Sequence, residues 1–323
     1  MSYGLLTFVL RNRSIAWLFA FALAFSAPAL AQQSLTIHND HLTVAVQPKD
    51  GSYEISTPAI HGPALISRVG AEINQRWIRS TDYPRHRAKQ GVSHDLLGAG
   101  HTLEITFSGL PNEPELVCLL TLYDQQPYGS IQVTVENTTR RAVTVQAIRV
   151  VDAQDEPLIN LGAPEEDDRV MAETYTEDPS IHIGTLSQAP HGAYFGVRDD
   201  LIYNLQSKQA LLLAALTSDR FLTISHLQVT QPASPGAARI ASFTMDSTGT
   251  TEAVLTRDPI APEQRVTLSL PVAPRRGALS SELVLFDAGS RYFNMLERYG
   301  AAVRSLHQAR VSSKAPMGWW SWT

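Results

Sequence analysis

The sequence predicts an all-β protein, a large antiparallel β-sandwich followed by one C-terminal helix. Segments in which apolar and polar residues alternate recur along most of the 323 residues, and Gly, Pro, Asn and Asp separate them. Almost no helix-like stretch lies between these segments, so we expect the strands to pair antiparallel. Their number exceeds that of a simple immunoglobulin-type domain, which favours two large twisted sheets packed face to face.

The N-terminal segment is expected to be removed from the mature protein. Arg11 and Arg13 precede an apolar run from Ile15 to Phe25, and Ala29-Leu30-Ala31 has the small-residue pattern of a cleavage site. The run is shorter than the roughly 20 residues that a membrane-spanning helix needs. Residues 1–31 are therefore predicted to be a secretory signal peptide. This predicts an exported protein, periplasmic or secreted, with no membrane span after cleavage.

Residues 32–288 contain the predicted strands of the sandwich. In Ser130–Val135 the odd-numbered residues are apolar and share one face. Asn137-Thr138-Thr139 is interpreted as a hairpin loop, and it also matches an N-glycosylation sequon. Ala210–Leu216 has helix propensity, but its shortness and its strand-rich neighbours favour a buried strand. The candidate strands are Leu42–Val46, His101–Phe107, Leu116–Tyr123, Ser130–Val135, Ala142–Val151, Gly192–Val197, Leu201–Leu205, Ala210–Leu216, Phe221–Leu227, Ala238–Met245, Arg265–Val272 and Leu283–Phe286.

One helix is predicted near the C-terminus, within residues 289–310. From Ser290 to Ala309 apolar residues recur at three- and four-residue spacing, so one face of this helix is apolar. Asp287 or Ser290 is expected to cap its N-terminus. Residues 311–323 form a separate segment, because Pro316 disfavours helix at the residue before it. The apolar residues are Tyr292, Phe293, Leu296, Tyr299, Val303 and Leu306.

The sequence ends in Pro316-Met317-Gly318-Trp319-Trp320-Ser321-Trp322-Thr323. Each indole buries a large apolar area and needs packing partners, and a cluster of exposed indoles would form a sticky patch. We therefore expect this segment to be a strand whose partners lie beyond Thr323, which would make the chain a truncated part of a longer protein.

The same motif resembles the Pro-x-Gly-Trp-x-Ser-Trp sequence of the α-galactosidases (melibiases) of glycoside hydrolase family 36, with a fainter likeness to family 27. In that family the motif opens the first strand of a (β/α)8 barrel. An amphipathic helix of the type Tyr299–Val303 before the motif is also similar, as is Leu211–Phe221, an apolar strand followed by a polar turn and an arginine. The resemblance implies that residues 32–288 form the family's N-terminal β-supersandwich, and that residues 311–323 begin a barrel that is otherwise missing.

The resemblance implies retaining hydrolysis of α-galactosides, which uses two carboxylates. In the family both are aspartates on later barrel strands, so no catalytic residue is expected here. The acidic run Glu165–Asp168 is interpreted as a solvated loop, since like charges in series repel. We therefore expect a non-catalytic N-terminal domain of an exported retaining α-galactosidase-like enzyme, which supports the barrel. Its expected partners are the missing C-terminal barrel and an α-galactoside or related carbohydrate bound by the full-length enzyme, and a homo-oligomer is left open.

Two regions are expected to contribute to a sugar site. The resemblance places Trp322 at the C-terminal end of the first barrel strand, where active sites lie in such barrels. The second region, Trp77–Leu97, is predicted to be a long loop, and such loops are often functional. Trp77 or Tyr83 would stack on a sugar, while Asp82 or Arg85 would bind its hydroxyls. A polar surface loop without a ligand is the alternative.

Several other classes of function are disfavoured. Loss of residues 1–31 removes Arg11 and Arg13 and no acid, so the net charge changes from −5 to −7, which argues against a nucleic-acid partner. Cys118, the single cysteine, lies among apolar residues and is expected to be structural. His86 and His94 have no companions at metal-ligand spacing, and no phosphate-binding or other cofactor motif occurs. The remaining alternative is a stand-alone carbohydrate-binding or structural β-sandwich module.

Overall fold

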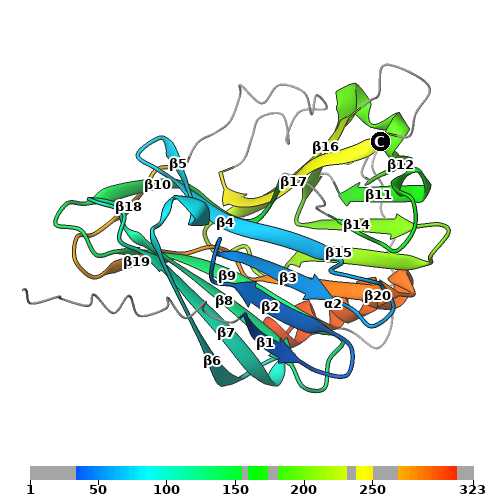
Figure 1. Ribbon diagram of the computed structural model, residues 1–323, viewed down its shortest axis with the longest axis horizontal. Helices are drawn as coiled ribbons and strands as arrows, with labels where there is room; N and C mark the ends of the chain where they lie inside the picture. The colour runs from blue at the N-terminus through cyan, green and yellow to red at the C-terminus, as the bar shows by residue number, and fades with distance from the viewer. Residues whose placement is uncertain (1–33, 155–158, 174–180, 231–237, 250–267, 311–323) are drawn as a thin grey trace, which may run out of the picture. The chain divides into compact units, whose positions relative to one another are not determined.

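A computed structural model describes residues 34–154, 159–173, 181–230, 238–249 and 268–310 (Figure 1). The predicted signal peptide, residues 1–31, and the segment 311–323 with Trp322 lie outside the described residues. Among the residues that are described, no helix is long and apolar enough to cross a membrane.

The described residues form two antiparallel sheets of ten strands each. In the first sheet the strand order is β1-β2-β3-β4-β10-β17-β16-β13, with β5 paired to β4 and β18 paired to β10. The strands of this sheet are β1 (Leu35–His38), β2 (Thr43–Gln47), β3 (Ser52–Ser56), β4 (Leu65–Ile73), β5 (Arg76–Arg79), β10 (Val143–Gln154), β13 (Ala193–Val197), β16 (Leu222–Thr230), β17 (Arg239–Thr248) and β18 (Leu270–Val272).

In the second sheet the order is β12-β11-β14-β15-β20-β9-β8-β7-β6, with β19 paired to β9. Its strands are β6 (Arg85–Asp95), β7 (Gly98–Ser108), β8 (Glu115–Tyr123), β9 (Tyr128–Asn137), β11 (Asp168–Glu173), β12 (Ile181–Thr185), β14 (Asp199–Asn204), β15 (Gln209–Ala215), β19 (Gly277–Ser280) and β20 (Val284–Ser290). In the described ranges, short 3₁₀ turns connect strands at η1 (Ser80–Asp82), η2 (Glu165–Asp167), η3 (Leu186–Gln188) and η4 (Pro190–Gly192).

The predicted β-sandwich is confirmed, and each candidate strand overlaps an observed strand where its residues are described. Period-2 alternation explains the fit, because every second residue of a half-buried strand enters the core. In β8, for example, Leu116, Cys118 and Leu120 are 0% exposed. Burial raises the pKa of the Cys118 thiol, in keeping with a structural cysteine.

The C-terminal helix α2 (Tyr292–Leu306) covers the outer face of the second sheet. Its apolar face packs with Leu201, Leu212 and Leu285 into a second apolar cluster, separate from the core between the sheets. Two polar contacts fix the helix. The Tyr299 hydroxyl donates to the carbonyl of Ala215 at 2.8 Å, and the His307 imidazole contacts the carbonyl of Leu216 at 2.7 Å.

The expected helix cap is wrong. Ser290 ends β20, and Arg291, which has a left-handed backbone (φ 66°), stands at the N-cap without a side-chain capping bond. Asp287 lies within β20 and accepts two hydrogen bonds from Arg298 of the helix, at 2.9 and 2.6 Å. Asp287 therefore holds the middle of the helix onto the sheet.

The predicted loop from Trp77 to Leu97 is also wrong. This segment forms β5, η1 and the long edge strand β6, which pairs with β7 over its whole length. Most side chains of β6 are exposed on both faces, so the strand has no apolar alternation for sequence reasoning to detect. Its hydrogen bonds to β7 explain why it is nevertheless extended.

The acidic run Glu165–Asp168 is only partly a solvated loop. Its first three residues form η2, but Asp168 begins β11 and is 2% exposed. The Glu165 carboxylate accepts a hydrogen bond from the backbone N–H of Ile240 at 2.7 Å. Two of the four acids thus have specific partners, which sequence spacing alone does not reveal.

Candidate functional site

A cluster of charged and aromatic side chains lies on the outer face of the first sheet. Arg149 of β10 stands opposite Asp246 of β17 and, on its other side, opposite Gly70 of β4, which is paired with Arg79 of β5. Residues directly opposite each other in antiparallel strands share a face. Phe243 of β17 lies in the core between the sheets, so Asp246 and its cross-strand neighbours face outward.

Arg149 is the centre of this cluster. Its guanidinium donates to both oxygens of Asp246, at 2.6 and 2.9 Å, and its Nη1 lies 3.5 Å from Oδ1 of Asp152. The guanidinium carbon lies 4.1 Å from the centre of the Trp77 ring, which is a cation–π contact. Burial acts to lower the pKa of Arg149, but the two aspartates outweigh it and raise this pKa.

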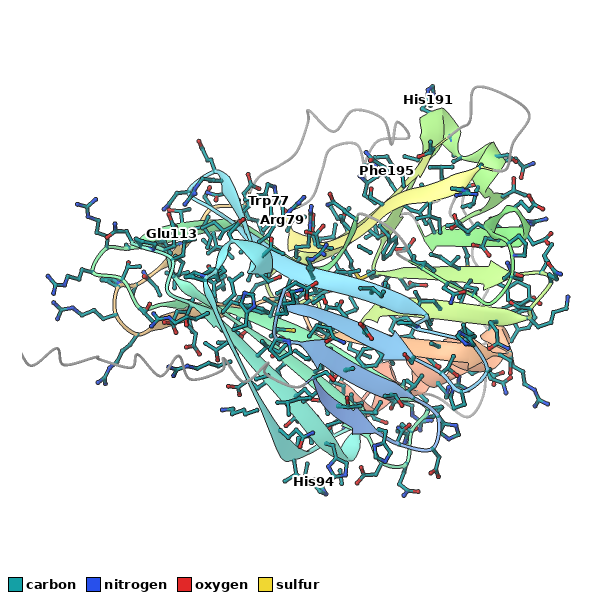
Figure 2. The ribbon with its side chains drawn as sticks, in the orientation of Figure 1. Trp77, Arg79, His94, Glu113, His191 and Phe195 are labelled. Atoms are coloured by element: carbon teal, nitrogen blue, oxygen red, sulfur yellow. The ribbon has the colours of Figure 1, made fainter. Side chains whose placement is uncertain are left out.

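Arg79 extends the cluster toward solvent, and Figure 2 shows it beside Trp77. Its Nε lies 3.2 Å from Asp152, and its Nη2 donates to the side chain of Gln154 at 3.1 Å. The Arg79 side chain is 42% exposed, whereas that of Asp152 is 3% exposed. Arg68 of β4 adds a weaker ion pair with Asp50, at 3.9 Å. The cluster thus holds three arginines and three aspartates, and Glu72 lies directly opposite Trp77 on the same face.

This arrangement suits binding better than catalysis. A carboxylate that acts as acid or nucleophile must exchange a proton or attack a substrate, but Asp152 and Asp246 are already neutralised by guanidinium groups. Trp77 is partly exposed, and one face of its ring contacts Arg149. The groups open to a ligand are the indole of Trp77 and the exposed guanidinium of Arg79, which suit a polar ligand such as a sugar.

The structure separates the four described residues that the sequence singled out. Trp77 belongs to the cluster. The Asp82 carboxylate accepts a hydrogen bond from the backbone N–H of Arg79 at 2.8 Å, so it shapes the turn η1 beside the cluster. Tyr83 is 3% exposed, and its hydroxyl donates to the carbonyl of Pro114 at 2.7 Å. No face of the Tyr83 ring is therefore open for stacking in this structure.

Arg85 lies apart from this cluster, at the first position of β6. It lines a pocket formed by the β7–β8 and β9–β10 loops. The sugar-binding roles predicted for Trp77, Asp82 and Arg85 stay predictions.

Sequence reasoning missed the charged partners of Trp77. Arg149 and Asp152 are the two charged residues of β10, and these charges within a mostly buried strand were the available signal. Asp246 lies 97 residues after Arg149, and only the pairing of β10 with β17 brings them together. Among the described residues, no group of three or more His, Cys, Asp or Glu side chains is placed to hold a metal ion.

No protein-family model matches the chain, and no curated protein matches it in sequence. Solved structures do match in fold. An α-galactosidase from Lactobacillus brevis aligns with a TM-score of 0.51 at 12% identity, covering 84% of this chain and 42% of the enzyme. The α-N-acetylgalactosaminidase NagBb from Bifidobacterium bifidum aligns with a TM-score of 0.54 at 8% identity, covering 84% and 38%. The family 36 α-galactosidase AgaA from Geobacillus stearothermophilus gives 0.48 at 11% identity, covering 84% and 42%.

This chain has the fold of the N-terminal β-sandwich domain of family 36 α-galactosidases. The resemblance predicted from the C-terminal motif is thus confirmed at the level of fold. The chain spans about two fifths of the length of the enzymes that it matches.

Proposed function

We propose that this chain is the non-catalytic β-sandwich of an exported retaining α-galactosidase-like glycoside hydrolase, and that it serves a catalytic barrel as a structural partner. The observation that supports this most is the fold itself, which matches the β-sandwich of an α-galactosidase over 84% of the chain. The ion pairs of Asp152 and Asp246 also support a non-catalytic role, because both carboxylates are bound by arginines and neither is available as nucleophile or acid.

Within that role, we assign the Trp77 cluster to the rim of the sugar site. An indole suits the apolar C–H face of a galactoside, and the exposed guanidinium of Arg79 provides donors for hydroxyl groups. Asp82 supports this surface indirectly, because it fixes the backbone N–H of Arg79. Trp322 remains a candidate for the same sugar site.

The first experiment measures turnover of a nitrophenyl α-galactoside by the purified chain. We expect none above a buffer blank. Turnover that co-purifies with the chain would overturn the proposed non-catalytic role.

The second experiment measures binding of an α-galactoside by calorimetry, for the chain alone and after addition or fusion of a family 36 barrel. We expect Trp77→Ala to weaken binding by the barrel-containing protein about tenfold, because aromatic contacts contribute about 0.5–1.5 kcal/mol beyond the area they bury. Phe293→Ala is the matched control, since Phe293 is 67% exposed on α2 and takes no part in the cluster. Equal losses in both variants would refute the rim role.

The stand-alone binding module makes a different prediction. It requires tight galactoside binding by the chain without any barrel, and a loss of that binding in Trp77→Ala. That result would show that the chain is a stand-alone carbohydrate-binding module and would overturn its proposed role as a structural partner of a barrel.

A further inference from the structure

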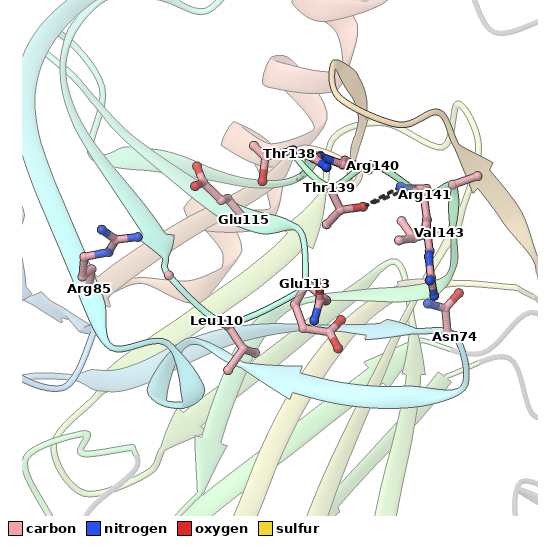
Figure 3. Close-up of a pocket in the computed structure, with 13 residues that line it drawn as sticks. Asn74, Arg85, Leu110, Glu113, Glu115, Thr138, Thr139, Arg140, Arg141 and Val143 are labelled. Atoms are coloured by element: carbon pink, nitrogen blue, oxygen red, sulfur yellow. Dashed lines mark hydrogen bonds between the residues drawn. The ribbon is translucent and has the colours of Figure 1, made fainter.

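A pocket of about 730 Å³ lies where three connections meet: the β4–β5 turn, the β7–β8 loop and the β9–β10 loop (Figure 3). The volume lies within the range of about 300–1,000 Å³ that small-molecule sites occupy. The proposed function does not use this pocket, apart from the predicted role of Arg85. The residues that line the pocket lie outside the Trp77 cluster, so failure of the proposed function would leave the role of this pocket untouched.

The lining of the pocket is cationic. Figure 3 shows Arg85 on one side of the pocket and Arg140 and Arg141 on the other. Arg275 and Arg276 lie in the adjoining β18–β19 turn, which is joined to the β9–β10 loop by a hydrogen bond from the Arg275 N–H to the Thr139 carbonyl at 2.9 Å. All five arginine side chains are exposed.

Few acids offset these arginines. Two glutamates, Glu113 and Glu115, also line the pocket, and the first is already ion-paired with Arg76. Within the described parts of the chain, no carboxylate forms an ion pair with Arg140 or Arg141. An excess of positive charge at one site is notable in a chain whose net charge is −5.

The arginine-bearing loop is held in place by a buried amide. Asn137 is 1% exposed, and its side-chain N–H groups donate to the carbonyls of Arg141 at 2.8 Å and Val272 at 3.0 Å. Its Oδ1 accepts from the hydroxyl of Thr139 at 2.7 Å. The sequon residue thus has a structural role, and its burial leaves no room for a glycan. A loop fixed in this way presents Arg140 and Arg141 with little backbone freedom to lose on binding.

Arg85 is positioned by a glycine. Gly109 has a φ of +90°, and a Cβ at this position would lie 2.7 Å from Nε of Arg85. The missing side chain therefore allows the guanidinium to lie against the β7–β8 loop. A side chain at position 109 would displace Arg85 from the pocket wall and would also adopt an unfavourable backbone conformation.

We propose that this pocket binds an acidic saccharide, a sugar that carries a carboxylate or sulfate group. Guanidinium groups bind such oxyanions through paired, charge-assisted hydrogen bonds. Asn74, Asn112 and Thr138 line the same pocket and provide donors and acceptors for hydroxyl groups. A simple anion would use the arginines alone, whereas this combination of arginines with amides and hydroxyls matches an anionic sugar.

The test is calorimetric titration of the full chain with trigalacturonate, a sulfated chondroitin disaccharide, neutral galactotriose and inorganic phosphate, each at low and physiological salt. We expect at least one of the two acidic saccharides to bind at least tenfold more tightly than galactotriose and phosphate, and the preferred one identifies the anionic group. We expect Arg140→Gln combined with Arg141→Gln to weaken that binding by at least tenfold, with an unchanged melting temperature because both side chains are exposed.

The matched control is Arg239→Gln combined with Arg304→Gln, which removes the same charge from exposed positions on β17 and α2. Its affinity for the acidic saccharide should equal that of the wild type. Equal weakening in both double variants would mean that overall charge, not this pocket, governs binding, and would overturn the proposal. Phosphate affinity equal to that of the acidic saccharides would overturn the saccharide assignment, and failure of both acidic saccharides to bind would overturn the site.

Discussion

Replacing Asp168 by asparagine should stabilise the protein at alkaline pH and leave it nearly unchanged at acid pH. The carboxyl is 2% exposed at the start of β11, where its Oδ1 accepts a hydrogen bond from the amide of Asn204 at 2.7 Å. Burial raises the pKa of Asp168 from 3.8 to about 7, Glu165 and Asp167 act in the same direction, and the Asn204 amide opposes them. Asparagine is an uncharged isostere that still presents an oxygen to Asn204.

The pKa difference sets the sign and size of the effect. Between pH 3.8 and about 7 the folded protein retains the Asp168 proton that the unfolded chain has lost, so stability falls as the pH rises through this window. One pKa unit corresponds to about 1.4 kcal/mol, so the full difference amounts to at most about 4 kcal/mol above pH 7. At roughly 2–4 °C per kcal/mol for a domain of this size, the melting temperature should differ by several degrees.

Thermal unfolding of Asp168→Asn and wild type, followed by circular dichroism from pH 5 to pH 8.5, measures this effect. The variant should already melt slightly higher at pH 5, because the loss in the wild type begins near pH 3.8, and the difference should widen until about pH 7 and then stay constant. Asp40→Asn serves as the control, because Asp40 is exposed and loses the same charge. Parallel profiles for Asp168→Asn and wild type would show that the buried carboxyl does not carry the predicted pH dependence.

Two further predictions concern buried carboxylates that have strong partners. Arg298→Leu leaves the buried carboxylate of Asp287, whose pKa burial raises to about 6, without its guanidinium partner. This variant should destabilise the fold by about 3–5 kcal/mol in urea unfolding. The double variant with Asp287→Leu should recover most of this loss, and no recovery would refute the pairing argument. Burial alone would raise the pKa of Glu282, but hydrogen bonds from Thr217 and from the N–H groups of Asp219, Arg220 and Phe221 lower it. Glu282→Gln should therefore destabilise the fold by about 1–3 kcal/mol at pH 7 and by less near pH 4. An equal loss at both pH values would contradict this.

The strands that sequence reasoning identified share one property, which is a face buried in the core. Residues 131, 133 and 135 alternate with polar residues, and the structure places them at 1%, 0% and 0% exposure. Strand β6 lacks that property, since its eleven residues are mostly polar on both faces, and it is extended only because β7 offers an open edge. A pattern search detects burial, so an edge strand without burial is invisible to it, although β3 and β4, which have buried faces, were also not among the candidate strands.

The candidate site was less predictable for the same physical reason. Trp77 was singled out as an aromatic residue in a polar segment, but its proposed binding role depends on its contact with Arg149. The two residues meet only because β4 pairs with both β5 and β10. Asp287 shows the same limit: next to a predicted helix start it is a natural capping residue, yet the fold directs it to Arg298, eleven residues later. Side-chain partners are a tertiary property, and local spacing does not determine them.

The two proposed sugar sites differ in how their charges are arranged, and this difference separates them by experiment. In the Trp77 cluster each arginine already has an aspartate partner, so ligand binding changes little net charge and should depend weakly on salt. In the pocket, Arg140 and Arg141 have no such partner among the described residues, so an anionic ligand should lose affinity steeply as salt rises. Galactoside binding that resists salt together with acidic-saccharide binding that salt abolishes would assign the two ligands to two different surfaces. A common salt dependence would mean that one surface accounts for both.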